Sequence, residues 1–120
     1  MKIAIPMNEM RIEAEICVSF GRAPYFLFYD TQSKESVFVE NPGAVSQGGA
    51  GIKAAQTLVD ANVEALLTVR CGENSAEVFQ AAEIKVYKTT KVTALENIEA
   101  FEKEELAPLT HFHGGFHGKV

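Results

Sequence analysis

The chain has 120 residues, a formal net charge of −5, and 47% hydrophobic against 22% charged residues. This length suits one domain with a single core, and the composition is that of a soluble globular protein. The acidic balance argues against a general nucleic-acid binder, and no apolar stretch approaches the ~20 residues of a membrane-spanning helix. Because the start has no signal-peptide core, we expect a cytoplasmic protein.

The N-terminal part of the chain predicts three strands and an extended arm. Residues 2–5 form a short apolar run that Pro6 is expected to end. Apolar and polar residues alternate over 11–18, which indicates an extended segment with one covered face. Aromatic and branched residues at 25–29 and 37–39 flank a turn-forming segment, which predicts an antiparallel hairpin.

From residue 51 onward the pattern changes to alternating helices and strands. Apolar spacing predicts helices over 51–61 and 74–82, and buried runs predict strands over 65–69 and 84–87. Right-handed crossovers would make these strands parallel to the first strand, with the hairpin beside it. We therefore predict an α/β fold, a three-layer α/β/α sandwich with a mixed five-stranded sheet.

Local signals mark the expected helix ends. Asn62 is a left-handed stop for the first helix. Asn74 and Glu77 have the spacing of a capping box. Thr93 and Glu96 have the same spacing and open a third helix. The residues of that helix that we expect to face inward are Leu95, Ile98 and Phe101.

A glycine cluster runs directly into the first predicted helix. The glycines Gly48, Gly49 and Gly51 precede its apolar stripe. A glycine-rich entry leaves unpaired backbone N–H groups at the positive end of the helix dipole, and this arrangement receives anions. The alternative is that these glycines only allow a tight turn and close helix packing.

Several basic residues are predicted to meet at one edge of the sheet. The loops that follow the first, fourth and fifth strands carry Arg22, Arg70 with Gly72, Lys88 and Lys91. In open α/β sheets, ligands sit outside the carboxyl ends of the parallel strands, and a local basic rim suits an anionic ligand. Arg22 would contact that ligand, and the alternative is that it clamps a loop carbonyl.

Both cysteines are candidate metal ligands. Cys71 lies beside Arg70 and just ahead of a helix, so its pKa is expected to fall and its thiolate to be available. The alternative is a small buried packing residue. Cys17 lies on the polar face of the arm and is expected to be exposed. In a cytoplasmic protein, free thiols or metal ligands are favoured over a disulfide.

The last residues form a segment of their own. We divide the chain into a domain over 1–109 and a mobile tail over 110–120. The three histidines of the chain lie in this glycine-rich tail at His111, His113 and His117. They could wrap one transition-metal ion, and the alternative is incidental metal binding. Phe112 and Phe116 suggest docking of the tail on the sheet edge or on a partner subunit.

Three segments resemble the family of dinitrogenase iron–molybdenum cofactor biosynthesis proteins. They are 19–26, 47–58 and 82–87, and the Phe-Gly-Arg-Ala-Pro-Tyr-Phe run in the first is the most specific. The resemblance covers the chain up to the third helix. It implies a ribonuclease-H-like α/β/α sandwich and non-covalent carriage of anionic metal clusters based on iron and sulfur. Nitrogen fixation itself does not follow.

Two positions depart from the family pattern. Relatives often carry a histidine before the Phe-Gly-Arg segment and another before the glycine cluster, and here these places hold Ser19 and Gln47. The departures weigh against a cluster ligated by histidines in the manner of those relatives.

Our leading hypothesis is a non-catalytic carrier or storage protein for an iron–sulfur or molybdenum–iron–sulfur cluster, with cluster donor and acceptor proteins as partners. The alternative is a small-anion or nucleotide-binding regulatory module without metal. An enzyme with Cys71 as nucleophile is a third reading, but it has no visible base because every histidine lies in the tail.

Overall fold

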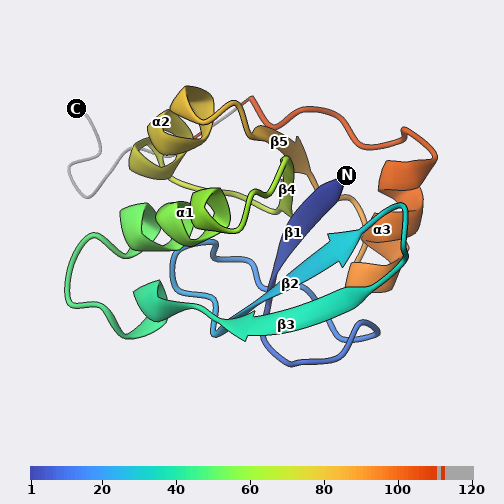
Figure 1. Cartoon of the computed structure of the whole chain (residues 1–120), viewed down its shortest axis with the longest axis horizontal. Coiled ribbons are helices and arrows are strands. Elements are labelled where there is room, and N and C mark those ends of the chain that lie inside the picture. Colours follow the sequence, from blue (N-terminus) through green and yellow to red (C-terminus); the bar gives the residue numbers. More distant parts are fainter. Residues whose placement is uncertain (111, 113–120) are drawn as a thin grey trace.

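The computed structural model describes residues 1–110 and 112. Its centre is a five-stranded sheet in the order β3-β2-β1-β4-β5 (Figure 1). The strands are β1 (Lys2–Met7), β2 (Tyr25–Asp30), β3 (Ser36–Glu40), β4 (Ala65–Thr68) and β5 (Lys85–Lys88). β1, β4 and β5 run parallel, whereas β1–β2 and β2–β3 pair antiparallel. The predicted mixed sheet and its hairpin are confirmed.

Helices cover both faces of the sheet, which confirms the three-layer sandwich. The helices are η1 (Pro42–Val45), α1 (Ala50–Asp60), α2 (Glu73–Ala81) and α3 (Ala94–Glu102). α1 and α2 lie side by side on one face, and α3 lies on the other (Figure 1). Asn62 follows α1 with φ 61°, the left-handed conformation that was predicted for it.

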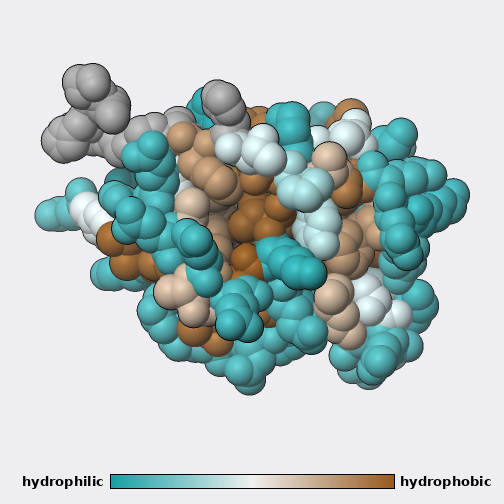
Figure 2. Space-filling view, turned by 90° about the horizontal axis from the view of Figure 1, so that it is seen from above, coloured by the Kyte–Doolittle hydropathy of each residue, from teal (hydrophilic) through white to brown (hydrophobic). Residues whose placement is uncertain are grey.

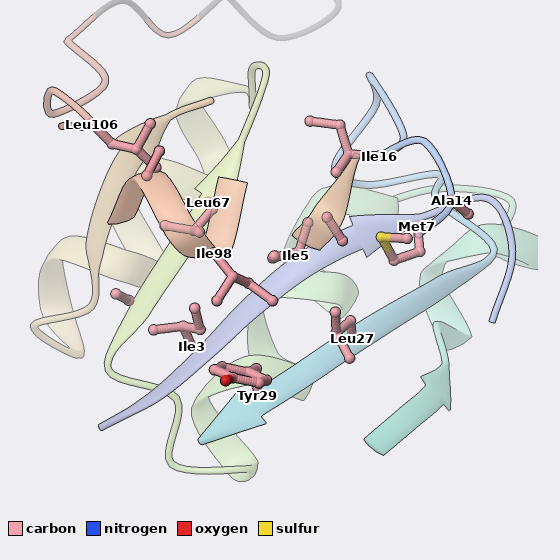
Figure 3. Packing of buried hydrophobic residues seen from close by; sticks show 13 residues of the cluster. Ile3, Ile5, Met7, Ala14, Ile16, Leu27, Tyr29, Leu67, Ile98 and Leu106 are labelled. Atoms are coloured by element: carbon pink, nitrogen blue, oxygen red, sulfur yellow. The ribbon is translucent and has the colours of Figure 1, made fainter. Parts of the chain in front are cut away.

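The alternation of side chains along β1 divides the core into two clusters. Ile3 and Ile5 are fully buried and pack with Ile98 of α3 (Figure 3). Ala4, which points to the opposite face, belongs to the cluster under α1 and α2. That cluster is aromatic, and the ring of Phe20 has centroid distances of 5.3 Å to Phe26 and 5.2 Å to Phe79. Full burial of a side chain of this size contributes roughly 1.5–3 kcal/mol.

The extended arm of residues 11–18 is a chain of bridges rather than a strand. Isolated bridges join Ile16 to Met7 and Glu15 to Thr93. Ala14 and Ile16 are buried as the alternation predicts, but Val18 is 53% exposed. The alternation of buried and exposed side chains therefore ends before Val18.

The expectation that Pro6 ends the first strand is wrong. Pro6 lies inside β1 and pairs with Phe26. Proline has no backbone N–H to donate to a neighbouring strand. Because β4 pairs with β1 only at Ile3 and Ala4, Pro6 faces no residue of β4 that would need this donor. The Pro6 carbonyl is used, because it accepts a hydrogen bond of 2.8 Å from the Cys17 N–H.

Two helix predictions also need correction. α2 begins at Glu73 after the N-cap residue Gly72, so Asn74 already lies in the first turn and no side chain caps this helix. The capping box of α3 at Thr93 is confirmed. Within α3, Leu95 is 38% exposed and does not face inward. The buried residues of α3 are Ala94, Asn97, Ile98 and Ala100.

The chain after α3 returns to the sheet along the outer side of β5. The Lys88 N–H donates to the Ala107 carbonyl at 2.9 Å, and the Leu109 N–H donates to the Val86 carbonyl at 2.9 Å. Residues 107–109 therefore cover part of the β5 edge. None of the helices in the described residues has the length and hydrophobicity to span a membrane. The division into a domain over 1–109 and a tail over 110–120 stays a prediction.

Candidate anion-binding site

Three loops enclose a hollow of about 930 Å³ at the carboxyl edge of the parallel strands. They are the end of the arm after β1, the glycine cluster before α1, and the loop between β4 and α2. We call it the anion hollow. The structure brings seven of the predicted site residues to its wall: Arg22, Gly48, Gly49, Gly51, Arg70, Cys71 and Gly72. That they bind a ligand stays a prediction.

Two helices begin at the wall of the anion hollow without a side-chain cap. α1 starts after Gly49, which has the left-handed φ of 66°, and α2 starts after Gly72. The first intrahelical hydrogen bond of α1 runs from Lys53 to Gly49, and that of α2 runs from Ala76 to Gly72, each at 3.0 Å. The N–H groups before these bonds have no intrahelical acceptor. Both dipoles thus present their positive ends to one hollow.

Ser75 lies at the junction of the two helix starts. It is 2% exposed and lines the anion hollow, and no hydrogen bond to another described residue engages its hydroxyl. A Cβ at Gly51 would stand 2.5 Å from Ser75 Oγ, so glycine allows α1 and α2 to approach this closely. Ser75 was not predicted from the sequence, because only the folded chain places it against Gly51, which lies 24 positions earlier.

Arg22 clamps the loop that precedes the glycine cluster. Its Nη1 donates to the carbonyls of Ser46, Ala44 (3.4 Å) and Gly43 (3.5 Å). The clamp that we considered as the alternative role of Arg22 is therefore present. Arg22 is also exposed at the wall of the hollow, so contact with a ligand stays a prediction.

Asn41 ties the same two loops together from inside. This buried side chain donates from Nδ2 to the carbonyls of Gly21 (3.0 Å) and Ala23 (2.8 Å), and its Oδ1 accepts from the Gly43 N–H at 2.9 Å. Because both of its polar atoms are satisfied by backbone, Asn41 fixes one loop against the other. The wall of the hollow is thus held by side chain to backbone bonds on both sides of η1.

Arg70 is the cation that the structure leaves available. It is exposed at the hollow, and within the described residues no hydrogen bond or ion pair engages its guanidinium. Glu73, in the first turn of α2, lines the same hollow and partly offsets the positive charge. The basic rim contains fewer residues than predicted, because Lys88 and Lys91 do not line the hollow.

The prediction of a reactive thiolate at Cys71 is wrong. Cys71 is only 2% exposed, and burial raises the pKa of its thiol to about 12. The effect of desolvation on the pKa of Cys71 outweighs that of the neighbouring Arg70 charge, because Cys71 belongs to the aromatic cluster under α1 and α2. The expectation that Cys17 is exposed also fails, since Cys17 is half-buried, and it does not line the hollow.

The remaining metal candidates are not brought together by the described part of the chain. No group of three or more histidine, cysteine, aspartate or glutamate side chains forms a metal site among residues 1–110 and 112. The tail histidines His111, His113 and His117 lie outside the described residues. Ser19 and Gln47, the two positions at which we expect departures from the family pattern, both line the anion hollow.

The fold and the site define a class of protein: an α/β/α domain with a hollow at its sheet edge that is built from backbone N–H groups and glycines. Comparison with known protein families narrows this class to one family. The family model described as dinitrogenase iron–molybdenum cofactor matches residues 1–104, and the chain belongs to this family.

Solved structures agree with this assignment. The apo form of the orange protein from Desulfovibrio gigas has a TM-score of 0.85 and 27% identity, over 91% of this chain and 96% of that one. A putative NifB protein from Thermotoga has a TM-score of 0.81 and 38% identity, over 92% and 95%. A putative dinitrogenase from Methanocaldococcus jannaschii, at 24% identity and a TM-score of 0.71 over 92% and 96%, shares the fold. A search of curated proteins finds no match. The ribonuclease-H-like label stays a prediction.

Proposed function

We propose that the chain binds and carries an anionic metal–sulfur cluster, of the iron–sulfur or molybdenum–iron–sulfur type, without catalytic turnover. The observation that carries this proposal is the convergence of two uncapped helix starts, the Arg70 guanidinium and the Ser75 hydroxyl on one hollow. Membership of the dinitrogenase iron–molybdenum cofactor family supports a cluster as the cargo. Proteins that donate and accept the cluster would be the partners.

The chemistry of the hollow suggests how such a cargo would be held. Its wall offers hydrogen-bond donors, namely backbone N–H groups, a hydroxyl and guanidinium groups. Burial raises the pKa of its one thiol, Cys71, to about 12, so a metal ion would have to displace the thiol proton in order to bind there. We therefore expect a cluster whose metals carry their own sulfur ligands, with the protein donating hydrogen bonds to the outer sulfur atoms.

The alternative is a regulatory module that binds a small oxyanion or a nucleotide. The same observation favours it, since a helix N-terminus is a general phosphate site. The two functions differ in a simple property. A metal–sulfur cluster gives the protein visible charge-transfer absorption, whereas a phosphate does not.

Reconstitution under anaerobic conditions tests the proposal. The full chain is incubated with iron and sulfide, or with molybdate and sulfide, and desalted. Visible absorption and elemental analysis should then show metal and sulfur in a fixed ratio to protein. Phosphate binding without any retained metal or colour would favour the regulatory module and contradict carriage.

Arginine variants show whether the cargo sits in the anion hollow. Arg70→Ala should weaken cluster retention about tenfold, because a charge-assisted hydrogen bond contributes roughly 1.5–3 kcal/mol and exposure reduces that value. Stability should stay within about 0.5 kcal/mol, as for a surface change. Arg11→Ala is the matched control, since Arg11 is exposed, pairs only with Glu9, and lies outside the hollow. Equal losses in both variants would mean that only net charge matters.

A further inference from the structure

A second depression lies between α2 and β5, on another side of α2 from the anion hollow. It has a volume of about 1060 Å³. Figure 2 shows hydrophobic residues gathered in a hollowed region on the face seen from above, with hydrophilic residues around them. We call it the α2–β5 groove. Its apolar lining includes Ala76, Phe79, Ile84, Val86, Leu109 and Phe112.

The α2 side of the groove is acidic. Glu73, Ala76, Glu77 and Gln80 recur at helical spacing, so they form one face of α2 along the groove. Both glutamates are exposed. On the β5 side the charged lining residue is Lys85. A segment with apolar anchors and basic side chains would therefore complement this surface.

The described chain itself already enters the groove. After pairing with β5, it places Leu109 and Phe112 in the groove lining, where Leu109 is 8% exposed and Phe112 packs against the cluster under α1 and α2. The sequence continues for eight residues beyond Phe112. The segment 113–120 therefore follows directly on a residue of the groove lining.

The composition of 113–120 matches the groove. It contains one aromatic residue, Phe116, four positions after Phe112. Four extended residues span at most ~14 Å, so Phe116 can reach the same apolar lining. The segment also carries Lys119 and has no acidic side chain, which complements the two glutamates of α2.

We propose that residues 113–120 bind in the α2–β5 groove of their own chain, with the Phe116 ring on the apolar lining and the Lys119 side chain toward the α2 glutamates. Because Glu73 lines both the groove and the anion hollow, the docked segment lies beside the hollow. The proposal depends on the groove and on the sequence of the segment, and it stands whether or not the hollow carries a cluster.

Nuclear magnetic resonance on the full, isotope-labelled chain tests the proposal. We expect nuclear Overhauser effects between the Phe116 ring and the methyl groups of Ile84, Val86 and Leu109. Phe116→Ala should abolish them and shift the backbone amide signals of the groove. Phe116→Leu, which keeps an apolar anchor, should leave those amide signals close to their original positions.

Two further variants separate docking from general effects. Val45→Ala removes methyl groups from a residue that is 87% exposed on η1, so the groove signals should not move. Glu77→Lys reverses the charge at an exposed position of the groove wall, so it should weaken the Phe116 contacts without unfolding the protein. Unchanged Phe116 contacts in Glu77→Lys would overturn the charge assignment.

Two outcomes would overturn the docking itself. One is the absence of Phe116 contacts, together with groove signals that Phe116→Ala does not move. The other is contacts that appear only between molecules in a mixture of labelled and unlabelled protein. In that case the occupant of the groove is the tail of a second copy rather than the tail of the same chain.

Discussion

The three α-helices in the described part of the chain begin in two different ways. α3 starts with a complete capping box, in which Thr93 Oγ1 accepts from the Glu96 N–H at 3.2 Å and Glu96 Oε1 accepts from the Thr93 N–H at 3.2 Å. α1 and α2 start after glycines and have no side-chain cap. α3 packs alone on one face of the sheet, whereas the starts of α1 and α2 meet at the anion hollow (Figure 1).

The difference indicates whether the free backbone N–H groups at a helix start serve the helix itself or a ligand. A capped end satisfies its own N–H groups, so it contributes to stability and offers little to a ligand. An uncapped end keeps these groups available and forgoes part of that stability. In this chain the capped helix is remote from the hollow, and the two uncapped helices form its wall. Substitutions at the helix starts can therefore separate stability from binding.

The largest expected effect is on the position of the α1 start. A Cβ at Gly43 would stand 2.5 Å from the Ala50 carbonyl oxygen in the first turn of α1, so backbone must move. Gly43→Ala should destabilise the protein by about 1–3 kcal/mol and weaken anion binding at the same time. Urea denaturation and phosphate titration measure both. Gly48→Ala is the control for stability, because no atom other than those of its chain neighbours lies within 4 Å of its added Cβ. Full stability in Gly43→Ala would mean that the loop adjusts freely.

The second-largest change in stability is expected at the capped helix, α3. Thr93→Ala should cost about 1 kcal/mol of stability and leave anion binding unchanged, because α3 is on the opposite face. The backbone N–H and the hydroxyl of Thr93 hold the pKa of Glu96 below its ordinary value. A lowered pKa stabilises the fold above pH ~4.5, and this stabilisation is lost as the pH falls through the folded pKa. The difference between the thermal melts of the two proteins should therefore narrow at acid pH without closing, because the Thr93 hydroxyl still accepts from the Glu96 N–H there. Weakened anion binding in Thr93→Ala would contradict the division of roles.

The smallest stability change should come from giving α2 the cap that it lacks. Gly72 is extended, with φ −84° and ψ 170°, so an aspartate can adopt its backbone conformation. Gly72→Asp should alter stability by only a few tenths of a kcal/mol, yet weaken anion binding about tenfold or more, because its carboxylate occupies the donors. Gly72→Asn is the matched neutral variant, which separates capping from charge repulsion. Undiminished calorimetric binding of phosphate to Gly72→Asp would place the anion away from α2.

Features with local causes could be predicted from the sequence. The hairpin follows from two aromatic and branched runs around a turn, and the α3 start follows from Thr93 and Glu96 alone. The convergence of the glycine loop with Arg22 and Arg70 follows from the general topology of parallel strands.

The failures concern residues whose environment depends on distant partners. Cys71 has a charged neighbour in sequence, but the aromatic cluster that surrounds it comes from other elements, and burial decides its pKa. Ser75 meets the hollow only because α1 and α2 approach at Gly51. Pro6 looks like a strand end until the register with β4 is known. In each case, a contact between elements overrides the local signal.

The pairing of residues 107–109 with β5 has a consequence for self-association. An open strand edge is a template on which another chain can add a strand, and such edges lead to aggregation. At β5 this template is partly occupied by the protein's own backbone. The other outermost strand, β3, has its single sheet neighbour in β2, and Val37 on it is 56% exposed. A strand that another molecule adds to this sheet is therefore expected at β3 rather than at the partly occupied edge of β5.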